Sequence, residues 1–255
     1  MIKNETSMQQ KSFELPYGGK QLTVTFTDLA DQAHGSAIVR YGDTAILVTA
    51  VMGVKESDKD YFPLSVEYEE RFYAAGQILG SRFIRREGRP SDEAVLSGRV
   101  VDRTIRPLFN NKMRRDVQVV ATVLSISEDD PDVLGVIGAS LALGTSKIPW
   151  SGPVSAVRIG KKKGSEELIV NPTYDERNAE DAELDLLVCG KDNAITMIEV
   201  GAKEVPEAVL EKAFAQALLE IEKVQTFQKK VFAEIGKEKE ARQLTKTLLA
   251  EALSD

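Results

Sequence analysis

Cysteine and histidine are nearly absent from this chain of 255 residues, where each occurs once, as Cys189 and His34. A single cysteine excludes a disulfide within the chain and fits a reducing compartment. Cys189 lies in an apolar run typical of a strand, so its sequence context favours a buried packing residue over a reactive thiol. His34 has no second histidine with which to form a metal site or a dyad.

Long apolar runs are also missing, and none approaches the ~20 residues that a membrane span requires. The first ten residues are polar and mixed, which is not the pattern of a signal peptide. We therefore expect a cytoplasmic protein with no membrane partner. Hydrophobic residues make up 42% of the sequence, enough to build the core of one large or two small domains.

Positive charge is scarce overall but concentrated in one window. The chain carries a formal charge of −7, yet the stretch from Arg82 to Arg115 holds nine arginines and one lysine against four acids. The window is therefore +6, and the rest of the chain is −13. A basic island on an acidic protein indicates a polyanionic partner.

The island is predicted to combine a loop with a helix. Gly88 and Pro90 disfavour regular structure before Ser91, which suits the N-cap of a helix that ends near Ile105, ahead of Pro107. Three arginines at positions i, i+4 and i+7 then share one helix face. They are Arg99, Arg103 and Arg106.

Guanidinium groups bind phosphates through paired donors, and an aromatic ring can stack on a base. The sequence therefore predicts a surface on the loop and the helix that binds phosphates and stacks on a base. Its candidate residues are Phe83, Arg85, Arg86, Arg89, Arg99, Arg103 and Arg106. The alternative is a solvated face whose arginines pair with the protein's own carboxylates; the loop position favours function.

The remaining pattern predicts an α+β fold of mixed sheets packed on helices. Alternating or β-branched runs predict strands at residues 21–27, 36–40, 44–51, 63–69, 117–126, 154–159, 168–170, 184–189 and 195–200. Asp130 as N-cap and Gly144 as C-cap frame a helix that is apolar all round and hence buried. From Pro206 the pattern is helical, with a break near Gly236 and a second helix to about Leu253.

We expect three segments: a flexible N-terminus at residues 1–11, a core domain at 12–225, and the beginning of an all-helical linker at 226–255.

Several motifs carry a family resemblance. The run GSAIVRYGDTAILVT at residues 35–49 resembles the opening hairpin of the ribonuclease PH superfamily. The blocks YAAG at 73–76, FIRREGRPS at 83–91, DRTIRPLF at 102–109 and IGAS at 137–140 are similar, in sequence and spacing, to the first core domain of the bacterial polynucleotide phosphorylase family. The resemblance covers about residues 12–225, and it implies that the candidate residues of the loop and the helix contact single-stranded RNA.

The resemblance implies a ribonuclease PH-like (ribosomal protein S5 domain 2-like) fold and a phosphorolytic 3'→5' exoribonuclease of RNA and mRNA degradation. In such an enzyme inorganic phosphate is the co-substrate and nucleoside diphosphates are released. The family forms homotrimeric rings with two related cores per subunit, holds Mg²⁺ in the second core, and can join RNA-degradation complexes. The chain ends before a second core would begin, so the resemblance implies part of a longer enzyme.

The resemblance also implies that this core is catalytically silent, with no catalytic or metal-binding residue of its own. The family's phosphate-holding serine run corresponds to residues 127–132, where four carboxylates (Glu128, Asp129, Asp130 and Asp132) would repel phosphate. The family's two metal ligands correspond to Arg177 and Glu183.

Three alternatives remain open on the sequence. The chain could be an active stand-alone ribonuclease PH-like enzyme, or a purely structural trimerisation domain that leaves Arg85 and Arg86 without a partner. The third alternative concerns the acidic stretch around Arg177, which could be either a metal site or a solvated loop. Its carboxylates are Asp175, Glu176, Asp181, Glu183 and Asp185.

Overall fold

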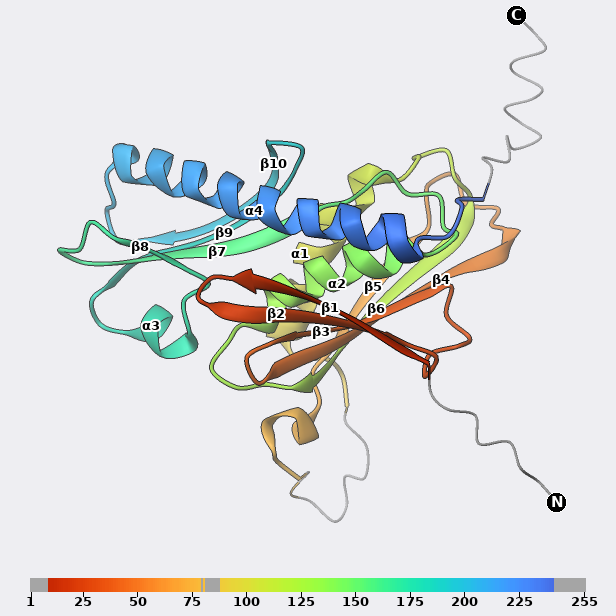
Figure 1. Ribbon diagram of the computed structural model, residues 1–255, viewed down its shortest axis with the longest axis horizontal. Helices are drawn as coiled ribbons and strands as arrows, with labels where there is room; N and C mark the ends of the chain where they lie inside the picture. The colour runs from red at the N-terminus through yellow and green to blue at the C-terminus, as the bar shows by residue number, and fades with distance from the viewer. Residues whose placement is uncertain (1–8, 79, 81–87, 241–255) are drawn as a thin grey trace, which may run out of the picture.

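The computed structural model describes residues 9–78, 80 and 88–240, which form two β-sheets with two helices between them (Figure 1). The first sheet has the strand order β1-β2-β3-β4-β6-β5, and the second has the order β10-β9-β7-β8. All neighbouring strands are antiparallel except β5, which pairs parallel with β6. The mixed α+β architecture predicted from the sequence is confirmed.

The first sheet consists of β1 (Gln10–Tyr17), β2 (Lys20–Thr27), β3 (Gly35–Tyr41), β4 (Thr44–Glu56), β5 (Leu64–Glu69) and β6 (Arg115–Ser125). The second sheet consists of β7 (Ser155–Lys162), β8 (Leu168–Val170), β9 (Ala182–Lys191) and β10 (Ala194–Ala202). The helices are α1 (Asp92–Ile105), α2 (Pro131–Thr145), α3 (Tyr174–Asn178) and α4 (Glu207–Ile235), with short 3-10 turns η1 (Phe72–Ala75) and η2 (Arg106–Leu108).

The predicted hairpin between β3 and β4 is present. Gly42 sits in its turn with φ +56°, a conformation that favours glycine. A Cβ there would also lie 2.7 Å from a carboxylate oxygen of Asp129, so the turn is pressed against the loop that precedes α2. This contact places the hairpin beside the charged side chains at the beginning of α2, which are described below.

The buried helix α2 begins where predicted, because Asp130 caps it by accepting a hydrogen bond from the Asp132 amide at 2.9 Å. The predicted end is wrong. The helix continues through Gly144 to Thr145 and is capped by Ser146. Gly144 is required for packing instead, since a Cβ there would lie 2.0 Å from the ring of Phe232.

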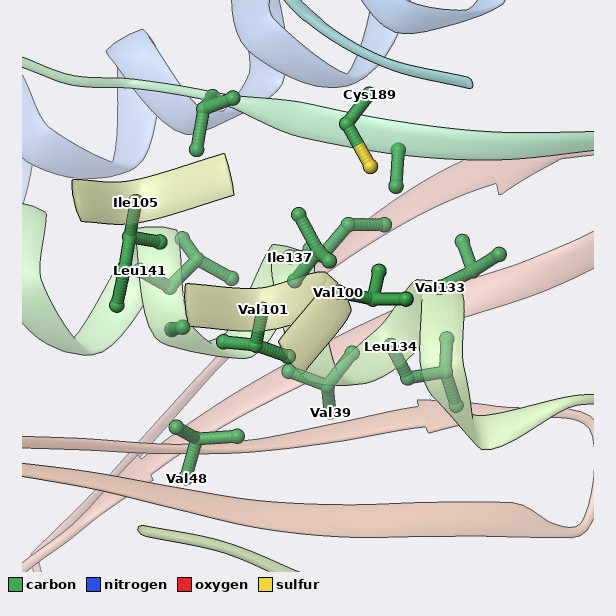
Figure 2. Close-up of a cluster of buried hydrophobic side chains, with 14 of the residues drawn as sticks. Val39, Val48, Val100, Val101, Ile105, Val133, Leu134, Ile137, Leu141 and Cys189 are labelled. Atoms are coloured by element: carbon green, nitrogen blue, oxygen red, sulfur yellow. The ribbon is translucent and has the colours of Figure 1, made fainter. Parts of the chain in front are cut away.

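The core lies between the sheets, where α1 and α2 pack on both (Figure 2). Val39 and Val48 reach α2 from the first sheet, and Cys189 points at the helices from the second. Cys189 is fully buried, as the sequence predicted, and burial raises the pKa of its thiol to about 12. This thiol is therefore a packing group.

Helix α4 covers the outer face of the second sheet and contacts β7 and β9 (Figure 1). It runs without interruption past residue 225 and ends at Ile235, with Gly236 as its C-cap, where a break was predicted. Strand β1 already begins at Gln10. The division into a flexible N-terminus, a core and a helical linker stays a prediction, and the second helix expected up to Leu253 lies outside the described residues. Among the described helices, none is long and apolar enough to span a membrane.

Candidate nucleic-acid interface

Helix α1 carries the candidate arginines, and local signals fix both of its ends. The Ser91 hydroxyl accepts a hydrogen bond from the Ala94 amide at 3.0 Å, and Asp92 and Glu93 occupy the first turn. The helix ends at Ile105, directly before the turn that contains Pro107. Both predicted ends are confirmed.

Arg99 and Arg103 lie on the solvent-facing side of α1 and are exposed. Within the part of the chain that the structure describes, neither guanidinium makes an ion pair or a hydrogen bond. The interpretation that these arginines neutralise the protein's own carboxylates therefore does not describe them. Two unpaired guanidinium groups, one helical turn apart, form the cationic face of α1.

Arg106 differs from the other two. Its guanidinium donates to both carboxylate oxygens of Asp102, at 2.6 and 3.0 Å, and to the Leu64 carbonyl at 3.1 Å. These bonds tie the end of α1 to the edge strand β5. Arg106 therefore stabilises the fold. The guanidinium donors that it uses for this are the ones that an RNA phosphate would need.

The loop that precedes α1 is closed at its base. The Ser91 hydroxyl donates to a carboxylate oxygen of Glu70 at 2.7 Å, so the residues that flank the stretch 71–90 are joined directly. Phe83, Arg85 and Arg86 lie outside the described residues. Arg89 is described, is exposed, and makes no ion pair or hydrogen bond to another described residue.

A cluster of charged side chains surrounds the beginning of α2. The ammonium group of Lys20 donates to Glu128 at 2.7 Å and to Asp129 at 2.6 Å. Burial disfavours this ammonium, but the hydrogen bonds and charges of the two carboxylates outweigh burial and raise its pKa. Lys20 of β2 therefore partly neutralises two of the carboxylates that were predicted to repel phosphate, Glu128 and Asp129.

Two guanidinium groups fill the centre of this cluster. Arg158 contacts Asp130 at 2.6 Å and Asp185 at 3.0 Å, and Arg177 contacts the same two carboxylates at 2.8 and 3.0 Å. The side chains of Arg158 and Asp130 are only 9% and 7% exposed. This four-membered ring of ion pairs joins β7, α3, β9 and the N-terminus of α2.

Asp132 is the least compensated member of the charge cluster. Burial raises the pKa of its carboxyl to about 6, and the charge of Asp130 adds to this effect. Arg158 lies 3.8 Å away and offsets only part of the penalty. The cavity beside Asp130 and Arg158 has a volume of about 10 Å³, which is room for one water molecule at most.

The charge cluster does not fit either group that the family's chemistry would require. Its five carboxylates exceed its three cations, so it retains a net charge of −2 and repels phosphate, for which it also has no room. Mg²⁺ needs free carboxylate oxygens, but Asp185 is held by Arg158 and Arg177, and Glu183 is paired with Lys161.

The remaining acids of the stretch do not converge on a cation site either. Glu176 closes the capping box of α3 with Thr173. Among the residues that the structure describes, no group of three or more histidine, cysteine or acidic side chains has the geometry to hold a metal ion. The geometry therefore favours ion pairs and capping over a metal site.

Sequence reasoning missed Lys20 and Arg158, which supply two of the three cations of the cluster. Arg158 had a signal, because it is the lone charge in the fully buried part of β7, residues 155–160. Lys20 had none, since its partner Asp129 is 109 residues away in the sequence.

Fold and sequence together define the class of protein. Residues 18–149 match the 3' exoribonuclease family, domain 1, and residues 152–219 match the 3' exoribonuclease family, domain 2. The chain belongs to this family. The first match covers the first sheet from β2 onward together with α1 and α2, and the second covers the second sheet and the first half of α4.

Solved structures agree on the fold. A chain of the Archaeoglobus fulgidus exosome with RNA bound to the active site has a TM-score of 0.62 at 18% identity, covering 86% of this chain and 87% of that one. Rice Rrp46 has a TM-score of 0.64 at 13% identity, covering 90% of this chain and 97% of that one. The predicted ribonuclease PH-like fold is confirmed.

More similar relatives are polyribonucleotide nucleotidyltransferases. The protein of Exiguobacterium sibiricum is 44% identical over 98% of this chain, and that of Heliobacterium modesticaldum is 47% identical over 89%. The matches cover 34% and 32% of those relatives, so the chain spans about a third of their length. The resemblance to the polynucleotide phosphorylase family, which bears this enzyme name, is confirmed.

Proposed function

We propose that this chain is the RNA-guiding first core of a polyribonucleotide nucleotidyltransferase, a phosphorolytic 3'→5' exoribonuclease. In the reaction an oxygen of inorganic phosphate attacks the phosphorus of the terminal RNA linkage, and the 3' oxygen of the preceding nucleotide leaves. A nucleoside diphosphate and an RNA shortened by one residue result. The role of this core is to hold the single strand while a second core supplies the chemistry.

One observation carries the proposal. Among the described residues, the exposed arginines of α1 are unpaired, whereas the arginines at the position expected for catalysis are paired with carboxylates. Arg99 and Arg103 have no partner among the described residues, as befits groups that await phosphates. Arg158 and Arg177 are instead both paired with Asp130 and Asp185. The chain thus offers cations to RNA on α1 and none to inorganic phosphate at α2.

The wider assembly belongs to the same proposal. It comprises a homotrimeric ring, Mg²⁺ bound by the second core, partners in RNA degradation and a cytoplasmic location. When bound, Mg²⁺ would stabilise the charge that develops on the transferred phosphoryl group. No residue described here is assigned to that ion.

Salt-dependent binding of oligo(A) by two double variants tests the guiding role. Arg99→Ala with Arg103→Ala removes two predicted phosphate contacts. We expect the slope of log K against log salt to fall by about 1.4, at about 0.7 for each phosphate on a single strand. The affinity at low salt should fall roughly 10- to 100-fold because two charge-assisted contacts are lost.

The control removes the same charge elsewhere. Lys212→Ala with Lys230→Ala takes two exposed cations from α4, which lies on the outer face of the second sheet. Its slope should stay within error of the wild type. Equal losses in both double variants would mean that bulk charge, and not the face of α1, determines binding. Unchanged affinity in the arginine variant would favour a purely structural domain.

A further inference from the structure

The turn η1 presents two large rings to solvent, although the protein is rich in charge and has ample core to bury them. Phe72 is 44% exposed and Tyr73 is 57% exposed. The next residue, Ala74, is 7% exposed and packs into the core. The rings are therefore displayed by a turn that is itself anchored.

Backbone hydrogen bonds fix this turn. The Ala74 amide donates to the Arg71 carbonyl at 2.9 Å, and the Gly76 amide donates to the Tyr73 carbonyl at 3.0 Å. Gly76 ends the turn with φ +65°. The Ala74 carbonyl accepts from the amide of Ile126 at 3.0 Å, which ties the turn to the end of β6. A ring on such a turn loses little conformational freedom when it binds.

The position of the turn relates it to the candidate arginines. Glu70 and Ser91 are hydrogen-bonded at 2.7 Å, and this contact is the base of the loop between them. Tyr73 lies three residues beyond the base on one limb, and Arg89 lies two residues beyond it on the other. At ~3.5 Å per extended residue, the Tyr73 backbone lies within roughly 10 Å of this base and the Arg89 backbone within roughly 7 Å.

We propose that Tyr73 is a base-stacking platform for single-stranded RNA, acting beside Arg89 on the opposite limb of the loop. This inference rests on the proposed function and adds a site to it. Sites for single strands combine an aromatic face for the base with a cation for the phosphate, and this pair supplies both.

Tyr73→Ala provides the first test, with two ligands of equal length and charge: an oligo(A) and an abasic ribose-phosphate oligomer. Removing a stacking ring should weaken oligo(A) binding by about 5- to 150-fold. Binding of the abasic oligomer should not change, because that ligand has no base to stack. Tyr61→Ala is the matched control, since Tyr61 is 58% exposed and lies before β5, outside the loop.

Fluorescence provides a second readout that does not depend on affinity. The natural sequence has one tryptophan, Trp150, which is 7% exposed. Tyr73→Trp should therefore add an exposed emitter that oligo(A) quenches and the abasic oligomer does not, whereas Tyr61→Trp should remain unquenched.

The outcomes separate this inference from the function on which it rests. If the wild type binds oligo(A) with strong salt dependence but Tyr73→Ala and Tyr73→Trp behave like the Tyr61 variants, stacking at Tyr73 is overturned and RNA guidance stands. If the wild type binds neither oligomer, the guiding role itself fails. If Tyr73→Ala changes the mass measured by light scattering and leaves RNA binding intact, the turn is a protein contact and the inference is wrong.

Discussion

Replacing Asp132 by asparagine should stabilise the protein at alkaline pH and lose this advantage in acid. The Asp132 side chain is 21% exposed and lies beside Asp130, and partial burial together with the charge of Asp130 raises the pKa of its carboxyl from 3.8 to about 6. Because the folded pKa lies above the unfolded one, the folded state holds the proton more tightly. The stability that this proton confers is fully present below pH 3.8 and is lost as pH rises through about 6.

The magnitude follows from the same two pKa values. A folded pKa that lies one pH unit above the unfolded pKa corresponds to about 1.36 kcal/mol. Integrating the linkage between about pH 4.5 and pH 8 gives a loss of about 2 kcal/mol from this one group. Asparagine has nearly the shape of the protonated acid and does not titrate, so Asp132→Asn should escape the loss. The difference in unfolding free energy between variant and wild type should change by about 2 kcal/mol in favour of the variant over this range.

Urea unfolding at the two pH values, followed by circular dichroism, measures this difference. Asp130→Asn is the matched control, because Asp130 contacts Arg158 and Arg177 at 2.6 and 2.8 Å. That variant should be destabilised by roughly 3 kcal/mol or more at pH 8, since it leaves buried guanidinium groups poorly paired. A pH-independent difference for Asp132→Asn, or a variant less stable at pH 8 than at pH 4.5 relative to wild type, would refute the reasoning.

Two further substitutions test the assignment of individual residues. Arg106→Ala should lower the free energy of unfolding by about 1–2 kcal/mol, because the bonds to Asp102 and Leu64 are lost, and should leave the salt slope of RNA binding unchanged; a reduced slope would make Arg106 an RNA contact. Gly144→Ala should cost about 1–3 kcal/mol in urea unfolding, because its Cβ would lie 2.0 Å from the Phe232 ring. Phe232→Leu should recover part of that loss in the double variant; strictly additive losses would count against this packing contact.

Local signals in the sequence were enough to place α1. A serine cap, two acids in the first turn and a following proline all act within a few residues of the helix ends, and both ends were predicted correctly. The end of α2 was missed because Gly144 has another reason to be there. Its partner, Phe232, belongs to α4 and comes close only in the folded chain. A glycine near a helix end cannot reveal from sequence whether it serves a cap or a contact.

A short helix and the contacts between residues far apart in the sequence could not be fully predicted, for related reasons. The five residues of α3 are too few for a periodic pattern, although their capping box was visible in Thr173 and Glu176. The charge cluster could be predicted in part, since four of its five carboxylates lie within residues 128–132. The cations that neutralise it come from β2, β7 and α3, and only the fold brings them together. For this reason the acidic run appeared purely repulsive.

Phosphorolysis by this chain as it stands is the sharpest test of a core that guides RNA without cleaving it. Poly(A), inorganic phosphate and Mg²⁺ are incubated with the protein while release of nucleoside diphosphate is followed, and filter binding of the same RNA is measured in parallel at two salt concentrations. We expect salt-sensitive binding without release of ADP. Release that persists in repeatedly purified protein and is abolished by Asp185→Ala would contradict a silent core, because the charge cluster at α2 would then be a working active site.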